Sequence, residues 1–583
     1  MQETDHTLPS KQTRKSGRRA RTGCETCRIR RVKCDETPGL CRNCTSTGRK
    51  CEGYSMTRLP RWRNRKTNSN SNQLGLQLGP ALFDADLGAA LAGKTSDERR
   101  CFHVFQNQTI PMFVSLFDSA DIWHVVLQMC QSDPSVCYAV VAFSALHEGT
   151  LVRQGYSGAR ALENPFRDFA LKQHGKALGS LAGRLGSNDP EMRSVALVCC
   201  VVFVLFELLN NNYSGIIVHI QNGVNVLAND KGAAARASVI SGAVHPSCAG
   251  NTSGFEVALR RTFAHIDVHS SPFEWARLTP SGDDHFDILV DLDACPVWFD
   301  SLNGARETLD PLINNVFALW RLAQPILRTH HSDTDPIYQN LIAEHHKMRI
   351  YLSRHIAAFN TFLSHHQPPL ATPREQRSRD VIRLHHLVLY INIEACITLS
   401  ELIFDTFPIE WREAIDLADG IITSYITEFG SSNLPNLVID LGVSLPLSWI
   451  SLKCRDFTIR QRAIDLLRRW PHAEGMHNTT LLMNLGQAAC DVESEAVEDP
   501  LTGVVPEEAR IRTVDIQVDT RERGTATATL SYWLSDPRAR HLVRRERVFD
   551  LEGPKRFKMP GKQRRQTGET AWSSASRPSY AIT

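Results

Sequence analysis

Six cysteines within 28 residues constrain the fold of this chain more than any other feature. Two Cys-x2-Cys pairs and two single cysteines follow one another at intervals of six residues: Cys24, Cys27, Cys34, Cys41, Cys44 and Cys51. Between them the only large apolar side chains are Ile29, Val32 and Leu40. A segment this short and polar cannot build a hydrophobic core, so disulfides or metal ions must hold it together.

The sequence around these thiols favours metal over disulfides. Two cysteines at Cys-x2-Cys spacing converge on one tetrahedral ion, with zinc–sulfur bonds of about 2.3 Å. Residues 1–23 are polar and basic without an apolar run, unlike a signal peptide, and a cytosolic or nuclear chain keeps its thiols reduced. Six thiols bind either one ion with two to spare or two ions through two bridging thiolates. The internal repeat favours two ions.

The cysteine pattern, with Pro38 in its middle loop, resembles the fungal Zn2Cys6 binuclear cluster of the galactose-regulator type. The resemblance covers about residues 18–54 and leaves no cysteine of the family pattern unmatched. It implies two Zn²⁺ ions with Cys24 and Cys41 bridging. Cys27 and Cys34 would complete one ion, and Cys44 and Cys51 the other.

Basic side chains fill most of the gap between the second and third cysteines, and more precede the cluster. They are Arg28, Arg30, Arg31 and Lys33 in the gap, and Arg18, Arg19 and Arg21 before it. Arginine matches the O6/N7 edge of guanine, and a short helix fits the major groove. The resemblance places base contacts near Arg30 and Arg31 and leaves Arg28 and Lys33 for phosphate. A merely solvated charged face is the alternative.

Charge is distributed unevenly along the chain. Residues 11–66 contain 18 Lys or Arg against four Asp or Glu, whereas the whole chain carries only +3, so the remainder is net acidic. A basic head on an acidic body is typical of a nucleic-acid-binding protein whose body has another task. The basic runs also suit nuclear-import signals.

The segment after the cluster predicts a linker rather than a dimerisation coil. Residues 55–100 begin basic and continue with the low-complexity tract 67–72. Residues 74–91 contain Leu and Phe without a sustained heptad and are interrupted by Gly75, Gly79 and Pro80. A dimerising coil needs about three heptads or more. The oligomeric state therefore stays open.

Residues 101–552 predict a large, mainly α-helical domain. Apolar residues recur at steps of three and four, which favours helices at Ile110–Met129, Ser135–Arg153, Asn164–Leu185, Glu191–Leu209, Phe255–Ile266, Gly304–Leu327, His345–His366, Ser378–Phe407, Trp411–Phe429 and Leu445–Trp470. Residues 230–253 predict an exposed loop and 510–533 a small hairpin. Val195–Phe206 is apolar throughout, but a membrane span needs about 20 such residues, so we expect a buried helix.

Regions of low complexity or polar composition complete the predicted organisation. A disordered basic arm (1–18) precedes the metal-stapled Zn2Cys6 DNA-binding domain (19–54), a flexible linker (55–100) joins it to the helical domain, and a disordered tail (553–583) ends the chain. The body also resembles the fungal-specific helical regulatory domain, in stretches that include Ala139–His147, Leu259–Phe273, Trp470–Gly475 and Val505–Arg510. In relatives this domain modulates activation, sometimes through a small apolar ligand.

Catalytic patterns are not found in the body. It has no G-x-S-x-G, no phosphate-binding lysine loop and no H-E-x-x-H. Four His-His pairs (330–331, 345–346, 365–366, 385–386) are expected at the surface or at helix caps, because adjacent helical residues point about 100° apart. The other ten cysteines fall mostly in apolar helical runs and are expected to pack as small hydrophobes.

These observations predict a nuclear, zinc-dependent, sequence-specific transcription factor that regulates RNA polymerase II transcription. We expect double-stranded DNA and the transcription machinery as partners, no membrane, and no catalytic residues. The resemblance implies CGG-like target triplets, and the acidic body favours activation. A zinc-dependent protein-interaction module and a thiol redox sensor without specific DNA binding are the alternatives.

Overall fold

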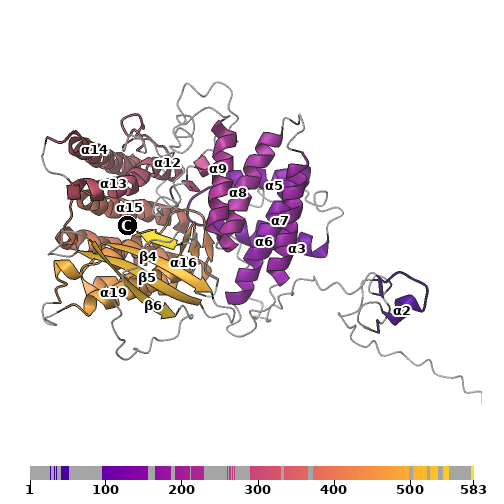
Figure 1. The fold of residues 1–583 in the computed structure, drawn as a ribbon. Helices are drawn as coiled ribbons and strands as arrows, with labels where there is room; N and C mark the ends of the chain where they lie inside the picture. The colour runs from indigo at the N-terminus through magenta and orange to yellow at the C-terminus, as the bar shows by residue number, and fades with distance from the viewer. Residues whose placement is uncertain are drawn as a thin grey trace, which may run out of the picture. The chain divides into compact units, whose positions relative to one another are not determined.

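The chain forms two compact units, Met1–Arg63 and Asn64–Thr583 (Figure 1). The smaller unit contains the cysteine-rich segment and the short helix α2 (Arg42–Thr45). The computed structural model describes residues 26–27, 30, 32, 34–35, 41–51, 95–154, 165–184, 189, 191–210, 212–228, 259, 261–263, 265–266, 268, 286, 289–329, 334–365, 372–431, 433–497, 503–520, 526–535, 542–550 and 579–582.

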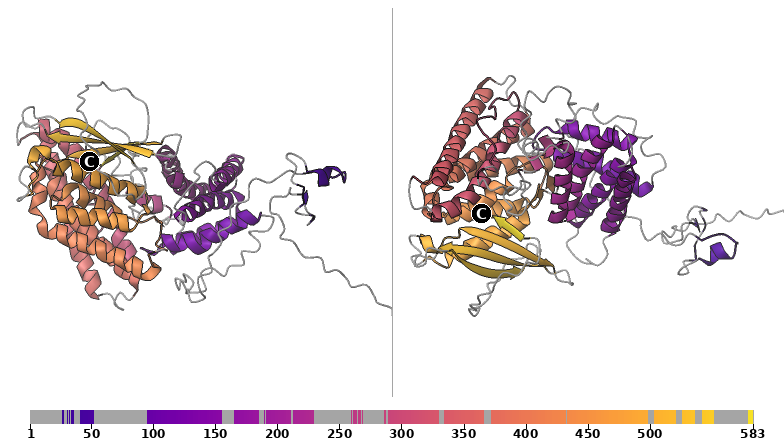
Figure 2. Two further views of the ribbon diagram at one scale, coloured as in Figure 1. Left: turned by 90° about the horizontal axis from the view of Figure 1, so that it is seen from below. Right: turned by 45° about the horizontal axis from the view of Figure 1, so that its top comes forward.

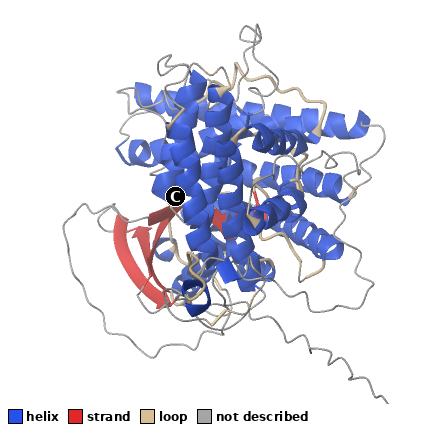
Figure 3. Cartoon of the chain, turned by 90° about the vertical axis from the view of Figure 1, so that its right-hand side faces the viewer, coloured by secondary structure: helices blue, strands red, loops and turns tan. Residues whose placement is uncertain are grey.

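The larger unit is mainly helical, which confirms the predicted fold class (Figure 3). Its first group of helices is α3 (Ser96–Val104), the π-helical turn η2 (Phe105–Thr109), α4 (Ile110–Phe113), α5 (Ala120–Ser132), α6 (Pro134–Gln154), α7 (Pro165–Ala182), α8 (Met192–Asn210) and α9 (Tyr213–Ala228). A capping box starts α3, since Thr95 and Glu98 bond each other's backbone N–H. Helix α6 packs against α7 and α8, and α8 packs against α9 (Figures 1 and 2).

One predicted helix of this group, Ile110–Met129, is wrong as a continuous element. Helix α4 ends at Phe113 and α5 begins at Ala120. In between, the carbonyl groups of Ser115 and Leu116 accept hydrogen bonds from Arg377 (2.9 Å) and from the hydroxyl of Ser378 on a helix far along the chain. The apolar spacing continues through the break, but these tertiary bonds and the burial of Leu116 and Phe117 hold the segment in another conformation.

Helix α8 is the most apolar helix of the first group. Among the described residues it alone is long and apolar enough to cross a membrane by length and composition, yet 72% of its most apolar window is buried inside the protein. The central helix of a globular core meets the same criteria. Its burial agrees with the buried helix that the sequence predicts.

The second group of helices surrounds the largest hydrophobic core. It comprises α12 (Leu302–Glu307), α13 (Asp310–Thr329), α14 (Pro336–His365), α15 (Pro373–Ala395), the 3₁₀ turn η5 (Glu401–Thr406), α16 (Pro408–Phe429), α17 (Ser444–Lys453), α18 (Phe457–Arg469) and α19 (Thr479–Ser494).

Three predicted helices of the second group are each two elements in the structure: Gly304–Leu327, Ser378–Phe407 and Leu445–Trp470. Local polar groups explain one of these breaks. Asp456 caps α18 by accepting the N–H groups of Thr458 and Ile459 at 2.9 and 3.2 Å, so the chain turns between α17 and α18. Helices α3, α9 and α19 are not among the helices that the apolar spacing predicts.

A four-stranded antiparallel sheet lies beside the helices of this unit (Figure 3). Its strands are β4 (Thr513–Thr520), β5 (Ala526–Ser535), β6 (Leu542–Asp550) and β7 (Ser579–Ile582), in the order β6-β5-β4-β7. Strands β4 and β5 pair where the hairpin is expected, with Thr513 opposite Trp533. Val514, Leu530 and Tyr532 are buried against the large core. Strand β7 lies in the tail for which the sequence predicts no structure.

A smaller sheet explains one of the stretches that carry the second resemblance. Strands β1 (Leu437–Val438), β2 (Ala473–Glu474) and β3 (His477–Asn478) pair in that order. The buried carboxylate of Glu474 accepts hydrogen bonds from the N–H groups of Gly442, Val443 and Ser444 at 2.9–3.2 Å, directly before and at the start of α17. Burial alone would raise the pKa of Glu474, but His472 and these donors hold it below its usual value. Within residues 470–475, Glu474 therefore satisfies backbone N–H groups at the start of α17.

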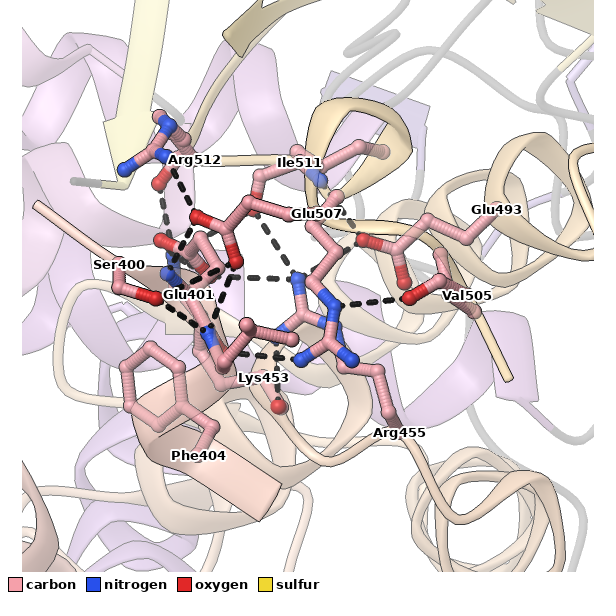
Figure 4. A network of polar contacts seen from close by, with 12 residues as sticks. Ser400, Glu401, Phe404, Lys453, Arg455, Glu493, Val505, Glu507, Ile511 and Arg512 are labelled. Atoms are coloured by element: carbon pink, nitrogen blue, oxygen red, sulfur yellow. Dashed lines mark hydrogen bonds and ion pairs between the residues drawn. The ribbon is translucent and has the colours of Figure 1, made fainter.

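The stretch Val505–Arg510 has a similar structural role in a buried network of charges (Figure 4). The carboxylate of Glu507 accepts the N–H groups of Glu401 and Leu402 at 2.9 and 3.0 Å, at the start of η5. Arg510 donates to Asp405 at 2.6 and 2.9 Å. These bonds fasten the segment before β4 onto the helices.

Glu493 on α19 is the centre of the same network. Its carboxylate pairs with Arg455 at 2.8 Å and with Arg460 at 2.5 Å, and it accepts the N–H of Ile511 at 2.7 Å. Lys453 pairs with Glu401 at 3.0 Å nearby. Figure 4 shows Lys453, Glu401, Arg455 and Glu493 close to Ile511 and Arg512, the residues just before β4. All the charged side chains of these ion pairs are buried, so each depends on its partners for compensation.

The expected surface position of the histidine pairs is wrong for three of their members. His345, His385 and His386 are buried. Burial of each ring is tolerated because the ring has a hydrogen-bond partner inside the protein. His345 bonds the carbonyl of Ile393 at 3.0 Å and His385 that of Gly442 at 3.0 Å. His386 bonds His355 at 2.9 Å. These rings therefore belong to the core.

Because His147 on α6 is another buried histidine, we expect the free energy of unfolding to depend on pH. Its ring lies 2.8 Å from Thr109 Oγ1 and 2.8 Å from Asn436 Oδ1, and burial lowers its pKa to about 4. Below pH 6.5 the unfolded chain takes up a proton that the folded chain does not, so stability falls as the pH falls toward 4. At about 1.4 kcal/mol per pKa unit, this histidine accounts for about 3 kcal/mol over that interval.

We expect His147→Gln to lower the free energy of unfolding at pH 7 and to flatten its decline between pH 6.5 and 4. Urea unfolding at several pH values measures both effects. The exposed His346, replaced by Gln, is the matched control and should keep the wild-type slope. An unchanged slope in His147→Gln would exclude this histidine as a source of the pH dependence.

Candidate zinc cluster

Five of the six predicted metal ligands lie together in the smaller unit. Cys27, Cys34, Cys41, Cys44 and Cys51 are all buried and form one cluster. Cys24 lies outside the described residues. Most of the described residues of α2 and the following turn are polar and exposed, and among the described residues of this unit no other hydrophobic side chain is buried with the thiols. The donor set of buried sulfurs suits a soft or borderline metal such as Zn²⁺.

Helix α2 positions the second Cys-x2-Cys pair. Cys41 is its N-cap, and the Cys41 sulfur accepts the N–H of Cys44 at 3.3 Å. The sulfur of Cys51 accepts the N–H of Cys41 at 3.3 Å. Backbone N–H donors toward sulfur stabilise the thiolate form, which is the form that binds metal. The helix thus orients the cysteines and also favours their ionisation.

Polar contacts hold the ends of the module together. The carboxylate of Asp35 accepts the N–H groups of Arg42 and Asn43 at 3.0 and 3.2 Å, and Thr26 Oγ1 donates to the carbonyl of Lys50 at 3.1 Å. Gly48 has φ +63°, a conformation that favours glycine, in the turn after α2. The sequence pattern indicates no role for Asp35 or Thr26, because partners separated by 7–24 residues leave no periodic signal.

The distances between sulfurs fit a shared metal site. Cys27 Sγ lies 3.6 Å from Cys41 Sγ and 3.7 Å from Cys44 Sγ. A tetrahedral ion with zinc–sulfur bonds of about 2.3 Å separates its sulfurs by about 3.8 Å. Two candidate ligand groups emerge, Cys27–Cys41–Cys44 and Cys34–Asp35–Cys41, and Cys41 is common to both.

Cys41 is thus the one residue common to both candidate groups, and its role as a bridging thiolate stays a prediction. The short distance between Cys27 and Cys44 would suit two ligands of one ion, whereas the resemblance assigns these two thiols to different ions. That distance alone does not divide the five thiols into two ligand sets. The division between two ions stays a prediction.

Of the seven basic residues predicted to contact DNA, Arg30 is described. Its backbone N–H donates to the carbonyl of Thr26 at 3.1 Å, a bond between residues four apart as in a helical turn. The side chain is half-buried, and among the described residues its Nη1 has no hydrogen-bond partner. The others lie outside the described residues: Arg18, Arg19, Arg21, Arg28, Arg31 and Lys33.

Comparison with known families identifies both parts of the chain. Residues 22–60 match the Fungal Zn(2)-Cys(6) binuclear cluster domain. Residues 100–370 match the Fungal specific transcription factor domain. The chain therefore carries a zinc-binding cluster of the fungal binuclear type followed by the fungal-specific helical domain, and both resemblances drawn from the sequence are confirmed.

Similar proteins are fungal transcription regulators. The aspercryptin biosynthesis cluster-specific transcription regulator atnN of Emericella nidulans is 30% identical over 36% of this chain and 35% of its own. The transcription regulator lscL of Purpureocillium lilacinum is 29% identical over 34% of this chain and 47% of its own. The transcriptional regulatory protein moc3 of Schizosaccharomyces pombe is 68% identical over 37 residues, 6% of this chain and 7% of its own.

The matched parts thus span less than half of each relative's length. No solved structure is significantly similar to this chain.

Proposed function

We propose that this chain is a zinc-dependent, sequence-specific DNA-binding transcription factor that acts in the nucleus on RNA polymerase II transcription. The observation that carries the proposal is the gathering of five buried thiols in one cluster within a strongly basic segment. Metal binding explains why the thiols are gathered. Binding to DNA, a polyanion, explains why residues 11–66 contain 18 basic residues and only four acidic ones. The names of similar proteins support the same function.

The six cysteines would hold two Zn²⁺ ions, with Cys24 and Cys41 bridging. When bound, zinc supplies structure rather than catalysis, because four-coordinate sites with thiolate ligands are closed. The cysteines would fix the basic segment after Cys27 as a short helix that can enter the major groove. Its Arg and Lys side chains would offset the negative charge of the thiolates and face the DNA.

Different basic residues would have different tasks. Arg30 and Arg31 would read guanine edges of CGG-like triplets, and Arg28 and Lys33 would contact phosphates. Arg18, Arg19 and Arg21 in the preceding arm would add phosphate contacts that make binding salt-dependent. The helical domain would regulate activation and contact the transcription machinery, with a small apolar ligand as one means of control.

We expect Arg31→Ala to relax sequence preference and Arg14→Ala to weaken binding to all sequences equally. Loss of a bidentate guanine contact costs about 1–3 kcal/mol of discrimination, whereas loss of a phosphate contact lowers the salt slope by about one. Binding of the full chain to a CGG-containing duplex and to a mutated duplex, at several salt concentrations, separates the two effects. Arg14→Ala is the matched control, since it removes the same side chain outside the cluster.

Equal losses on both duplexes in both variants would refute the base-reading role of Arg31. Binding that ignores sequence in the wild-type chain would favour the protein-interaction alternative. A chain that binds neither zinc nor DNA after mild oxidation, and regains both on reduction, would favour the redox sensor.

A further inference from the structure

Three potential metal ligands converge in the helical domain, far along the chain from the cysteine cluster. His174 lies on α7, Glu207 near the end of α8 and His219 on α9. One ligand atom from each residue lies within 4.8 Å of the other two. Two imidazoles and a carboxylate are a known zinc ligand set, with bonds of about 2.0–2.2 Å. Small side-chain adjustments would bring all three onto one ion.

Aromatic packing fixes the two histidines. The His174 ring stacks on Phe206 with centroids 4.3 Å apart and planes 4° apart, and it meets Phe203 edge-on at 4.7 Å. The His219 ring lies 5.1 Å from the Phe203 ring. Burial, and then the neighbouring His219, lower the pKa of His174 to about 4, so its imidazole is neutral at physiological pH. Neutral imidazole is the form that binds metal.

Glu207 is a buried carboxylate without a cationic partner. It is 8% exposed, and among the described residues no basic side chain forms an ion pair with it. The amide of Asn212 donates to Glu207 Oε2 at 2.8 Å, and burial raises the pKa of this carboxyl. A hydrogen bond of this kind, from a residue that does not itself bind the ion, orients a metal-binding carboxylate.

Gly215 on α9 has no side chain and so leaves space for the carboxylate of Glu207. A Cβ at this position would lie 3.0 Å from Cγ and Cδ of Glu207 and 2.6 Å from the Asn212 amide nitrogen. The backbone of α9 therefore approaches Glu207 closely, in the same helix that carries His219.

A ring nitrogen of His174 also lacks a hydrogen-bond partner among the described residues. This atom, Nε2, is buried. Buried polar atoms are normally paired, so an orphaned ring nitrogen beside a buried carboxylate that has no cationic partner among the described residues calls for a common partner. A divalent cation would satisfy both. A core in which the two histidines are only aromatic packing residues satisfies neither.

We propose that His174, Glu207 and His219 form a separate divalent-metal site of the zinc-binding type in the helical domain. Three protein ligands leave a fourth position for water or an exchangeable donor, so the ion would bind more weakly and exchange more readily than one held by thiolates. Because each ligand comes from a different helix, the ion would join α7, α8 and α9. The occupancy of this site would thereby couple free zinc to the rigidity of the regulatory domain.

The test is the zinc content of the full chain and of His174→Phe. The purified chains are equilibrated with Zn²⁺, freed of excess metal, and analysed for zinc per chain by elemental analysis and native mass spectrometry. Phenylalanine keeps the ring between Phe203 and Phe206 but removes both nitrogens. We expect the variant to hold one ion fewer than the wild type. The matched control, His346→Phe at an exposed position of α14, should hold the wild-type number.

A second variant, Glu207→Gln, keeps the shape of the side chain and a polar contact to Asn212. It should weaken binding of the same ion by at least tenfold in competition with a chelator. Equal zinc content and affinity in the wild type, His174→Phe and Glu207→Gln would overturn the proposal, as would the loss of an ion in His346→Phe. The difference of one ion does not depend on the number held by the cysteine cluster, so the two proposals fail independently.

Discussion

Replacement of Cys41 by Ala is expected to abolish zinc-dependent folding of the cysteine module and specific DNA binding. Cys41 is common to both candidate ligand groups, caps α2, and bonds Cys51 and Cys44 through its backbone N–H and its sulfur. Structural zinc contributes about 10–16 kcal/mol to the folding of small domains of this kind. None of the contacts among the described residues of this polar module can replace that energy.

The measurement pairs zinc content with DNA affinity in the full chain. Specific binding should fall to the non-specific level, a loss of roughly a thousandfold or more. Cys454→Ala is the matched control, because Cys454 is a buried cysteine at the end of α17, in the larger unit and outside the cysteine module. It should retain all of its zinc. A Cys41→Ala chain with wild-type zinc content and affinity would contradict the assignment of Cys41 as a ligand.

Replacement of Glu493 by Ala is expected to be the most destabilising change in the helical domain. It would leave Arg455 and Arg460 buried without their shared carboxylate and would remove the acceptor for the Ile511 N–H. Breaking a buried ion pair by removing one partner costs about 3–5 kcal/mol, because the remaining charge is uncompensated. Urea or thermal unfolding of the full chain, followed by helical circular dichroism, measures this loss.

An exposed ion pair provides the comparison. Asp416 pairs with Arg462 at 2.9 Å, and both side chains are largely exposed, at 61% and 42%. Asp416→Ala should cost less than about 1 kcal/mol, as surface pairs usually do. A Glu493→Ala variant as stable as Asp416→Ala would show that the buried network contributes little. Lost cooperativity with retained helix content would instead point to release of the segment before β4.

The sequence alone predicted the cysteine cluster and the helical body because both depend on regular spacing. Cys-x2-Cys pairs need only a turn to meet, and helices α6 and α16 have apolar residues at steps of three and four. Some missed boundaries also had a local signal. Thr95 with Glu98, and Thr372 with Glu375, are capping boxes that mark the starts of α3 and α15.

Other features depend on partners that are distant in sequence, which a single sequence does not reveal. The break at 114–119 depends on Arg377 and Ser378, and the burial of His385 depends on the carbonyl of Gly442. The proposed site of His174, Glu207 and His219 requires three helices to pack together. Such arrangements follow from the tertiary structure and leave no periodic pattern.

The central claim is that zinc bound by the cysteine module enables the chain to recognise a specific DNA sequence. Selection from a random pool of DNA duplexes by the full chain, with zinc and after its removal by a chelator, tests this claim most directly. We predict enrichment of duplexes with CGG-like triplets in the presence of zinc and none without it, and the spacing of the triplets would reveal the oligomeric state on DNA. A zinc-loaded chain that enriches no sequence would contradict the account.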